Sequence, residues 1–237
     1  MKDANEIREY YNDYTRRQIK SGLNYRHYKI LQDLIQSGLK RNHKVLEIGC
    51  GVGTLTGLII KYLKKGKMVA ADISDESIKI ARERLKKYRN IDFVVSDMSD
   101  FEYNETFDFI ILPDVLEHIP IEQHKRLFLN LDKHIHDDSI IFINIPHPKG
   151  IEFYEKNDPS KLQIIDQALH ADEFLKSIYA NGLILIDYKS YSLYHKEHDY
   201  ILIKLKRNKD VVYTSLPLSK VIRRKLLCRM NLFFSRF

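Results

Sequence analysis

The sequence predicts an α/β fold, with a sheet of seven mostly parallel strands, helices on both faces and an antiparallel last strand. From residue 44 onward, short apolar runs rich in β-branched and aromatic residues alternate with helical stretches. The runs are almost continuously apolar, which is typical of parallel strands covered by helices on both faces. Glycine-rich residues 49–53 join the first run to a helix. This junction lies where open α/β sheets bind ligands.

The expected elements follow one another along the chain. Two amphipathic helices open it, at 5–20 and at 24–38, and the second ends at Ser37-Gly38. Five strands come next, separated by helices at 54–65, 75–88 and 121–135; the strands are 44–48, 67–72, 91–95, 107–112 and 139–145. A helix at 171–181 ends at Asn181-Gly182. Strands at 183–189 and 199–206, joined by a Tyr/His-rich turn, predict an antiparallel hairpin.

Composition excludes several classes of protein. With 237 residues, 44% hydrophobic and 30% charged, the chain is typical of a globular domain rather than a disordered protein. No apolar run is long enough for a membrane-spanning helix, and the polar start of the chain predicts no secretory signal. Cys50 and Cys228, the two cysteines, are too few for a disulfide framework or a cysteine-based zinc site. We therefore expect a reducing, cytoplasmic location.

The net charge of +7 is concentrated at one end of the chain. Residues 220–237 contain six Lys and Arg and no acid, so the remaining 33 basic residues face all 32 Asp and Glu. The first 219 residues therefore sum to about +1, which disfavours a nucleic-acid-binding body. We expect the excess charge to form a separate basic tail.

The glycine-rich junction carries the strongest functional signal. Gly49, Gly51 and Gly53 alternate directly after a buried strand and before a helix. Glycines at this point allow a tight turn and let a ligand approach the main chain. A dinucleotide fingerprint would need glycine where Thr54 or Thr56 stands, and a phosphate-binding loop is absent. Nicotinamide and flavin dinucleotides are therefore disfavoured, and a glycine turn without a ligand is the alternative.

Acidic residues follow the next two strands. Asp72 ends the second strand, where a carboxylate can accept hydrogen bonds from both hydroxyls of a ribose. Asp97 lies in Ser96-Asp97-Met98 at the end of the third strand, in a position suited to an adenine amino group. A single Asp at a strand end is often only a helix cap or a turn residue. The ordered set of glycines and acids favours a nucleoside-containing ligand.

Taken together, these motifs resemble those of one protein family. Glu47-x-Gly49-x-Gly51-x-Gly53, followed by Asp72, Asp97 and residues 114–118 (DVLEH), is similar to class I S-adenosylmethionine-dependent methyltransferases, which have a Rossmann-like fold. The motifs span about residues 40–145, and the strand order about 40–206. The DVLEH stretch resembles small-molecule enzymes, including quinone-biosynthesis and surface-saccharide O-methyltransferases. The resemblance implies S-adenosyl-L-methionine as cofactor and S-adenosyl-L-homocysteine as product.

The resemblance also implies a role for individual positions. The three glycines line the methionine and ribose portions of the cofactor, Asp72 holds the ribose hydroxyls, and Asp97 with Met98 contacts the adenine. Leu112 and Pro113 lie near the methionine end, and the Tyr- and Arg-rich opening helices close over it. The complete set of expected cofactor-binding residues is Tyr14, Arg26, Glu47, Gly49, Cys50, Gly51, Gly53, Asp72, Ile73, Asp97, Met98, Leu112 and Pro113.

The chemistry requires little more than alignment, because the cofactor's sulfonium is already a strong electrophile. A hydroxyl acceptor also needs a base near neutral pH, and histidine is the natural choice. His147, His118 and His170 are the candidates, because each is expected near the carboxyl edge of the sheet. The chain lacks the Asp-Asp-Asn cluster of catechol-type enzymes, so no metal is implied.

Motifs for methylation of nucleic-acid bases are missing. Amine methylation of a base usually involves an [Asp/Asn/Ser]-Pro-Pro-aromatic motif where this chain has Leu112-Pro113-Asp114-Val115, and neither cysteine is placed as a nucleophile for carbon-5 methylation. We expect three regions: a helical lid at 1–39, a methyltransferase domain at 40–210 and a basic amphipathic tail at 217–237. Within the domain, segment 146–170 is an insertion on the acceptor side, which favours a small polar acceptor.

The tail predicts an amphipathic helix. Its apolar stripe lies within an arc of about 80° and is flanked by basic residues; the stripe is Ile222, Leu226, Met230, Phe233 and Phe237. Such a helix favours an anionic membrane surface, and packing on its own domain or on a second subunit of a homodimer is the alternative. We expect O-methylation of a saccharide or similar polar molecule, on a lipid carrier at the inner membrane face if the tail binds there. The alternatives are a quinone or aromatic O-methyltransferase and a cofactor-binding protein without catalysis.

Overall fold

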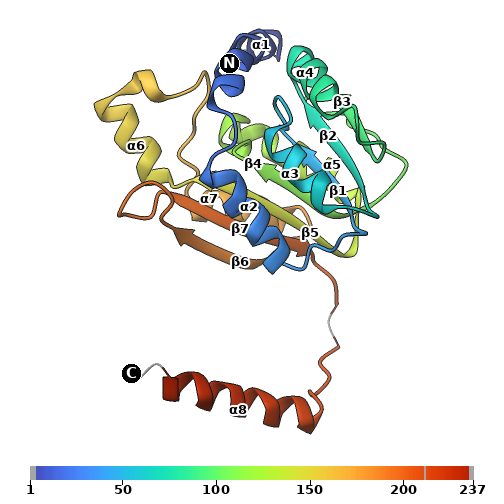
Figure 1. Cartoon of the computed structure of the whole chain (residues 1–237). Coiled ribbons are helices and arrows are strands. Elements are labelled where there is room, and N and C mark those ends of the chain that lie inside the picture. Colours follow the sequence, from blue (N-terminus) through green and yellow to red (C-terminus); the bar gives the residue numbers. More distant parts are fainter. Residues whose placement is uncertain (1–3, 211, 235–237) are drawn as a thin grey trace.

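The computed structural model describes residues 4–210 and 212–234 (Figure 1). Two helices, α1 (Ala4–Ser21) and α2 (Tyr25–Gln36), precede the sheet. The strands are β1 (Lys44–Ile48), β2 (Lys67–Asp72), β3 (Ile91–Val95), β4 (Phe107–Pro113), β5 (Ile135–Pro146), β6 (Leu183–Tyr191) and β7 (Tyr200–Arg207). The other helices are α3 (Thr54–Tyr62), α4 (Asp75–Leu85), α5 (Ile121–Asp132), α6 (Pro148–Asn157), α7 (Ala171–Ala180) and α8 (Leu218–Phe234), with short 3-10 turns at Leu116–His118 and Pro159–Lys161.

The seven strands form one sheet in the order β3-β2-β1-β4-β5-β7-β6. The first five strands are parallel to their neighbours, while β7 lies antiparallel between β5 and β6. The predicted α/β fold with an antiparallel last strand is therefore confirmed. The order reverses at β1 and β4, because the chain returns from the β3 edge to the middle of the sheet, and the carboxyl ends of these two strands are the switch point at which α/β sheets bind ligands.

The two main differences from the predicted elements concern β5 and segment 146–170. Strand β5 begins at Ile135, four residues before the expected start, because Ile135 pairs with Phe107 across an irregular register. Segment 146–170 contains helix α6, which was not predicted. Pro148 occupies the first turn of α6, where its fixed φ fits a helix start and its missing N–H costs nothing.

Each face of the sheet packs on its own set of helices. On one face Leu46 and Ile110 pack with Phe128 of α5 and Phe174 of α7. Alternate residues of the same strands point to the opposite face and pack with Ile30 of α2 and residues of α3. These side chains are almost completely buried. The two layers hold the strand ends, and hence the loops that follow them, in fixed positions.

Helix α1 reaches the carboxyl edge of the sheet and contacts the beginning of α4. The Thr15 and Ser77 hydroxyls are 3.1 Å apart, and Asn12 Oδ1 accepts a 2.6 Å hydrogen bond from the Ser74 hydroxyl. Because Ser74 also caps α4 through the Ser77 N–H, these contacts tie α1 to the loop that follows β2. At the other end of the chain, α8 lies apart from the sheet and its helices (Figure 1).

Candidate functional site

A cavity of about 370 Å³ opens at the carboxyl edge, beneath α1 and α2. Its wall comes from these two helices and from the loops that follow β1 to β4. Eleven of the thirteen expected cofactor-binding residues line it: Tyr14, Arg26, Glu47, Gly49, Cys50, Gly51, Asp72, Ile73, Asp97, Met98 and Pro113. The loops after β1 and β2 therefore meet the lid helices and the post-β4 loop in one place, although they are far apart in sequence.

Gly53 and Leu112 are not among the residues that line this cavity, so their position does not support the role expected of them. Leu112 is fully buried in the core, because its position in β4 directs the side chain between the sheet and α5. Gly53 has φ +75° and a Cβ there would lie 3.1 Å from Ala81. Its role is to allow close packing of α3 against α4, one layer below the cavity.

The glycine loop leaves room at the cavity wall. Gly49 and Gly51 have φ angles of +72° and +52°, which favour glycine. A Cβ at Gly49 would overlap the Val115 side chain, and one at Gly51 would lie 2.7 Å from Gln18 Oε1. The main chain of this loop is thus approached from both sides, by the post-β4 loop and by α1. A ligand with flat or narrow parts would fit against it without a side chain intervening.

Asp72 holds the glycine loop against the end of β2. Its Oδ2 accepts a 2.7 Å hydrogen bond from the Gly51 N–H, and its Oδ1 accepts a 2.9 Å bond from the Ser74 N–H. Burial raises the pKa of Asp72, while these N–H donors act in the opposite direction. Each carboxylate oxygen has further acceptor capacity. The geometry is suited to hydroxyl groups that enter between the two loops.

The loop after β3 contributes the next part of the wall. Met98 has a left-handed backbone, with φ +64°, and its N–H donates to Ser96 Oγ over 2.9 Å. Asp97 is exposed and accepts a hydrogen bond from the Ser99 N–H. This tight turn places a buried thioether and an exposed carboxylate beside each other at the cavity. The pair provides an apolar contact and a hydrogen-bond acceptor, which together suit a purine ring.

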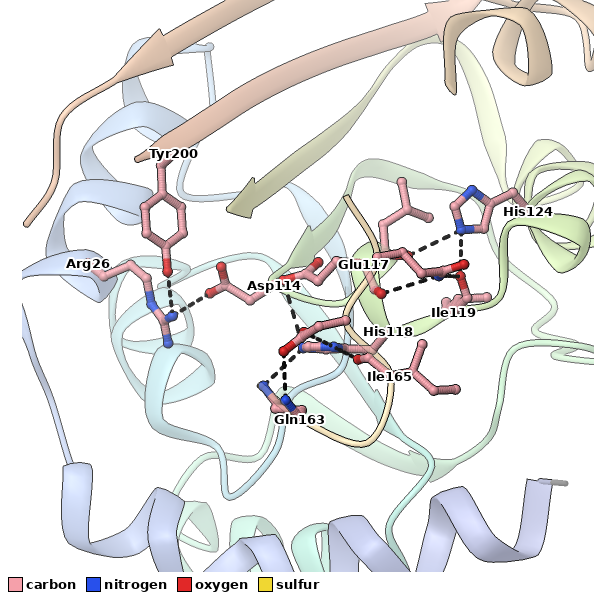
Figure 2. A network of polar contacts seen from close by, with 12 residues as sticks. Arg26, Asp114, Glu117, His118, Ile119, His124, Gln163, Ile165 and Tyr200 are labelled. Carbon is pink, nitrogen blue, oxygen red and sulfur yellow. Dashed lines mark hydrogen bonds and ion pairs between the residues drawn. The ribbon is translucent and has the colours of Figure 1, made fainter. Parts of the chain in front are cut away.

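Arg26, one of the expected cofactor-binding residues, is paired with other side chains of the protein at the cavity. Its Nη1 lies 2.9 Å from Asp114 Oδ2 and donates to the Tyr200 hydroxyl over 3.0 Å (Figure 2). The Asp114 carboxylate raises the pKa of Arg26, against the effect of burial, so Arg26 is permanently charged. Arg26 thereby fastens α2 to the post-β4 loop and to β7.

Asp114 is a site residue that the sequence analysis quoted but gave no role. It lines the cavity, and its backbone has φ +55°, which is rare for a residue other than glycine. Burial raises its pKa, and Arg26 opposes the rise. Strained backbone of this kind concentrates at functional sites. Its position directly after β4, within the DVLEH motif, was the signal that pointed to it.

His118 lines the cavity but is held as an acid rather than a base. Its Nδ1 lies 2.6 Å from the Ile165 carbonyl oxygen and 2.9 Å from Asp166 Oδ1, and its Nε2 lies 3.8 Å from Glu117 Oε1 (Figure 2). Burial lowers the pKa of His118, but Glu117 and Asp166 outweigh burial and raise it to about 9. His118 therefore carries its proton at neutral pH, which does not favour its expected role as the base.

This pairing predicts that the protein loses stability as the pH rises from 7 to 9. The unfolded chain releases the His118 proton near pH 6.5, whereas the folded chain holds it until about pH 9. The stabilisation from His118 is complete below pH 6.5 and is lost through pH 9, which amounts to about 2 kcal/mol between pH 7 and 9. Glu117, whose pKa burial raises to about 8, releases its proton in the same range and adds to the loss. Urea unfolding at both pH values, with Asp166→Asn as the comparison, measures this loss.

Asp166→Asn is expected to give a shallower decline, because the variant lacks one of the charges that raise the pKa of His118. The buried Cys50 thiol, whose pKa burial raises, contributes equally to both proteins near pH 9 and cancels in the comparison. An NMR titration of the His118 ring reports its pKa directly in the folded chain. A midpoint below 7 for His118 would contradict the assignment.

The other two candidate bases lie outside the cavity. His147 begins α6, and its Nδ1 accepts a hydrogen bond from the Lys149 N–H over 3.2 Å. His170 Nε2 lies 2.8 Å from Glu152 Oε1, so this ring ties α6 to the start of α7. Both rings serve the packing of segment 146–170. The expectation that either acts as a base is not supported by its position.

Within residues 4–210 and 212–234, no group of three or more His, Cys, Asp or Glu is arranged to hold a metal ion. The residues around the cavity form three parts. The glycine loop and the residues after β2 and β3 form one wall, Asp114 and His118 form the facing wall, and α1 with α2 covers both.

Comparison with known proteins agrees with this arrangement. Residues 45–138 match a family model described as a methyltransferase domain. The malonyl-[acyl-carrier protein] O-methyltransferase 1 of Ilyobacter polytropus is 28% identical over 99 residues, which are 42% of this chain and 36% of that protein. The matches to this and the next two curated relatives span about two fifths of each relative's length.

Two solved structures share the fold over most of the chain. The magnesium protoporphyrin IX methyltransferase of Synechocystis PCC 6803, with bound S-adenosylhomocysteine, has a TM-score of 0.66 at 19% identity, over 87% of this chain and 100% of that one. The N-methyltransferase NodS of Bradyrhizobium japonicum WM9 has a TM-score of 0.61 at 18% identity, over 78% of this chain and 95% of that one.

The cavity also fits the cofactor of these proteins. Gly49 and Gly51 carry no side chain at the cavity wall, Asp72 is placed to accept from hydroxyls, and Met98 with Asp97 suits a purine. Residues 45–138 thus form a methyltransferase domain, and the fold is similar to that of S-adenosylmethionine-dependent methyltransferases.

Proposed function

We propose that the chain transfers a methyl group from S-adenosylmethionine to a hydroxyl of a saccharide or similar polar small molecule. The observation that carries the proposal is the two-walled cavity, which sets the glycine loop and Asp72 opposite Asp114. When bound, the cofactor supplies an electrophilic methyl group on a neutral leaving group. The protein's part is to hold the two reactants in line, exclude water and receive the acceptor's proton.

Different residues of the cavity perform these tasks. Asp72 and the glycine loop hold the cofactor, and α1 with α2 covers it from solvent. Asp114 takes the place of the histidines as the group that receives a hydrogen bond, and then the proton, from the acceptor hydroxyl. The Arg26 guanidinium fixes that carboxylate at 2.9 Å, while the imidazolium of His118 balances the neighbouring acids.

The Tyr11 hydroxyl supports a donor role toward the acceptor. Tyr11 lines the cavity, and its pKa is raised far above the ordinary value, first by burial and then by the nearby Glu117 and Asp166 carboxyls. It therefore keeps its proton at any physiological pH. A polar acceptor would meet a donor in Tyr11 and an acceptor in Asp114, which favours a molecule that carries several hydroxyl groups.

An aromatic or quinone acceptor is the second candidate, favoured by the rings of Tyr11, Tyr14 and Tyr194 at the cavity. The names of the relatives include both oxygen and nitrogen methylation, on a malonyl-carrier ester, on (S)-coclaurine and by NodS. Asp114 beside a tyrosine hydroxyl supports an oxygen acceptor here. A lipid-linked saccharide is the form of this proposal that would follow from membrane attachment of the chain.

The test combines binding and transfer in the full chain. Calorimetric titration is expected to show micromolar binding of S-adenosylmethionine and S-adenosylhomocysteine. Methyl-labelled cofactor is then offered with nucleotide sugars and lipid-linked sugars in one arm and with catechols and quinone precursors in the other. Transfer of the labelled methyl group to a sugar acceptor supports the proposal. Transfer only to a catechol or quinone precursor favours the second candidate instead.

Two negative results of this experiment lead to different conclusions. If the intact chain binds neither form of the cofactor, the proposed methyl transfer is wrong at its first step. If the chain binds both forms but transfers label to no acceptor of either arm, a cofactor-binding protein without catalysis takes the place of the enzyme. The saccharide assignment fails in both cases.

A further inference from the structure

The C-terminal helix α8 takes no part in the site or in the sheet. Between β7 and α8, residues 208–210 and 212–217 form neither helix nor strand, and α8 lies apart from the domain in Figure 1. At its start the N–H groups of Lys220 and Val221 donate to the Pro217 carbonyl oxygen, so the local contacts close the first turn only. Packing of the tail on its own domain, one of the two alternatives for it, is contradicted by this placement.

Helix α8 combines exposed apolar side chains with cations. Leu218 is 73% exposed, Ile222 is 49% and Leu226 is 55%. The five cations are exposed as well: Lys220, Arg223, Arg224, Lys225 and Arg229. No Asp or Glu occurs after Asp210 in the sequence, so none of these charges has an acidic neighbour on the helix. Phe237 and Arg236 lie outside the described residues, as do the side chains of Met230 and Phe233.

The arrangement of these residues defines a face. Ile222 and Leu226 are four positions apart and lie on one side of the helix, with Arg223 and Arg229 at its borders. Before the helix, Val212 and Tyr213 are 87% and 94% exposed. A run of exposed apolar side chains flanked by cations costs free energy in water, and a helix of this length gains little stability by itself. A binding partner that covers this face of α8 would lower its free energy.

A second copy of α8, RNA and an anionic lipid surface match this face of α8 differently, and the charges favour the lipid surface. A second copy of α8 would bring five cations against five cations, which repel each other. RNA would satisfy the cations but would leave the apolar stripe in water. An anionic lipid surface satisfies both, because head groups pair with Lys and Arg while the acyl region takes the apolar side chains.

We propose that α8 binds the surface of an anionic lipid bilayer, with the Ile222–Leu226 face toward the acyl chains and the flanking arginines at the head groups. The helix would lie in the plane of the surface. None of the described helices is long and apolar enough to cross a membrane. This inference is independent of the proposed methyl transfer, since it concerns a segment that contributes no residue to the cavity.

The test is flotation of the full chain with vesicles, in the absence of cofactor and acceptor. We expect binding to vesicles of phosphatidylglycerol and phosphatidylcholine at 0.1 M salt. Binding to pure phosphatidylcholine, or at 0.5 M salt, should be at least tenfold weaker, because screening and loss of anionic lipid remove the attraction to the cations. Equal binding to both kinds of vesicle would overturn the electrostatic part of the proposal.

Two variants separate the cations from the apolar stripe. Arg223→Glu with Arg229→Glu should weaken partitioning at least about 20-fold, whereas the matched reversal of two exposed lysines on the body, Lys64→Glu with Lys65→Glu, should change it less than threefold. Leu226→Gln keeps the charge and should weaken partitioning about tenfold. If the body variant loses as much as the α8 variant, the site is not on α8.

Other outcomes also decide the question. A chain that ignores the vesicles but forms a dimer which Leu226→Gln dissociates would assign this face to a second copy. A chain that ignores them but binds RNA in a salt-dependent manner would assign the cations to nucleic acid. Either result overturns the membrane proposal. Calorimetric titration of the cofactor is unaffected by any of these results, so the two proposals fail independently.

Discussion

Asp72→Ala is expected to lower the affinity for S-adenosylmethionine at least about 100-fold. The carboxylate accepts from the Gly51 and Ser74 N–H groups and has capacity left for the two ribose hydroxyls. A hydrogen bond to a charged group contributes about 1.5–3 kcal/mol. The loss of two such bonds, together with the loosened glycine loop, accounts for an effect of this size. Calorimetric titration of the folded variant measures it.

The controls separate recognition from the integrity of the loop. Asp72→Asn keeps one oxygen that can accept from a backbone N–H, so it should bind more tightly than Asp72→Ala but less tightly than the original chain. Asp138→Ala removes an exposed carboxylate far from the cavity and should leave affinity unchanged. Thermal unfolding shows whether each variant folds. If Asp72→Ala folds and binds the cofactor normally, Asp72 has no part in recognition.

The fold could be predicted because its determinants are local. Each buried strand carries its own apolar run, and local signals such as the Ser74 cap of α4 mark where a helix begins. Helix α6 was not predicted because it has few apolar residues. Its start depends on His147 and Pro148, residue types that are also common in loops. The early start of β5 depends on pairing with Phe107, a contact that a single run does not encode.

The same distinction divides the site. Its cofactor wall could be predicted because the glycines and Asp72 stand at strand ends, and strand ends of a parallel sheet meet at one edge. Its facing wall could not, because the partners are distant in sequence: Arg26 reaches Asp114, and His118 meets Asp166. Without these pairings His118 is predicted to have the pKa of an ordinary histidine and to act as a base, a role that its raised pKa in the folded chain does not favour.

Asp114→Asn is expected to lower the rate of methyl transfer at least about 100-fold, with little change in cofactor affinity. The asparagine keeps the shape and accepts a hydrogen bond, but it cannot take the acceptor's proton, and a general base contributes about 10²- to 10⁴-fold. Single-turnover transfer, measured on an acceptor found in the labelling experiment, gives the rate. Titration of the same preparation gives the affinity, so that loss of binding is not mistaken for loss of chemistry.

The dependence of that rate on pH distinguishes a base from a merely structural residue. Burial raises the pKa of Asp114, so the rate of the original chain should rise with pH through a midpoint above that of an ordinary carboxyl group, and Asp114→Asn should lack this rise. His147→Ala and His170→Ala, whose rings lie outside the cavity, should keep rates within about twofold. If Asp114→Asn also stays within that range, the proton leaves by another route, as it would from an amine acceptor that is deprotonated before it binds. A carboxylate held by Arg26 on a strained backbone would then serve to fasten α2 over the cofactor rather than to carry a proton.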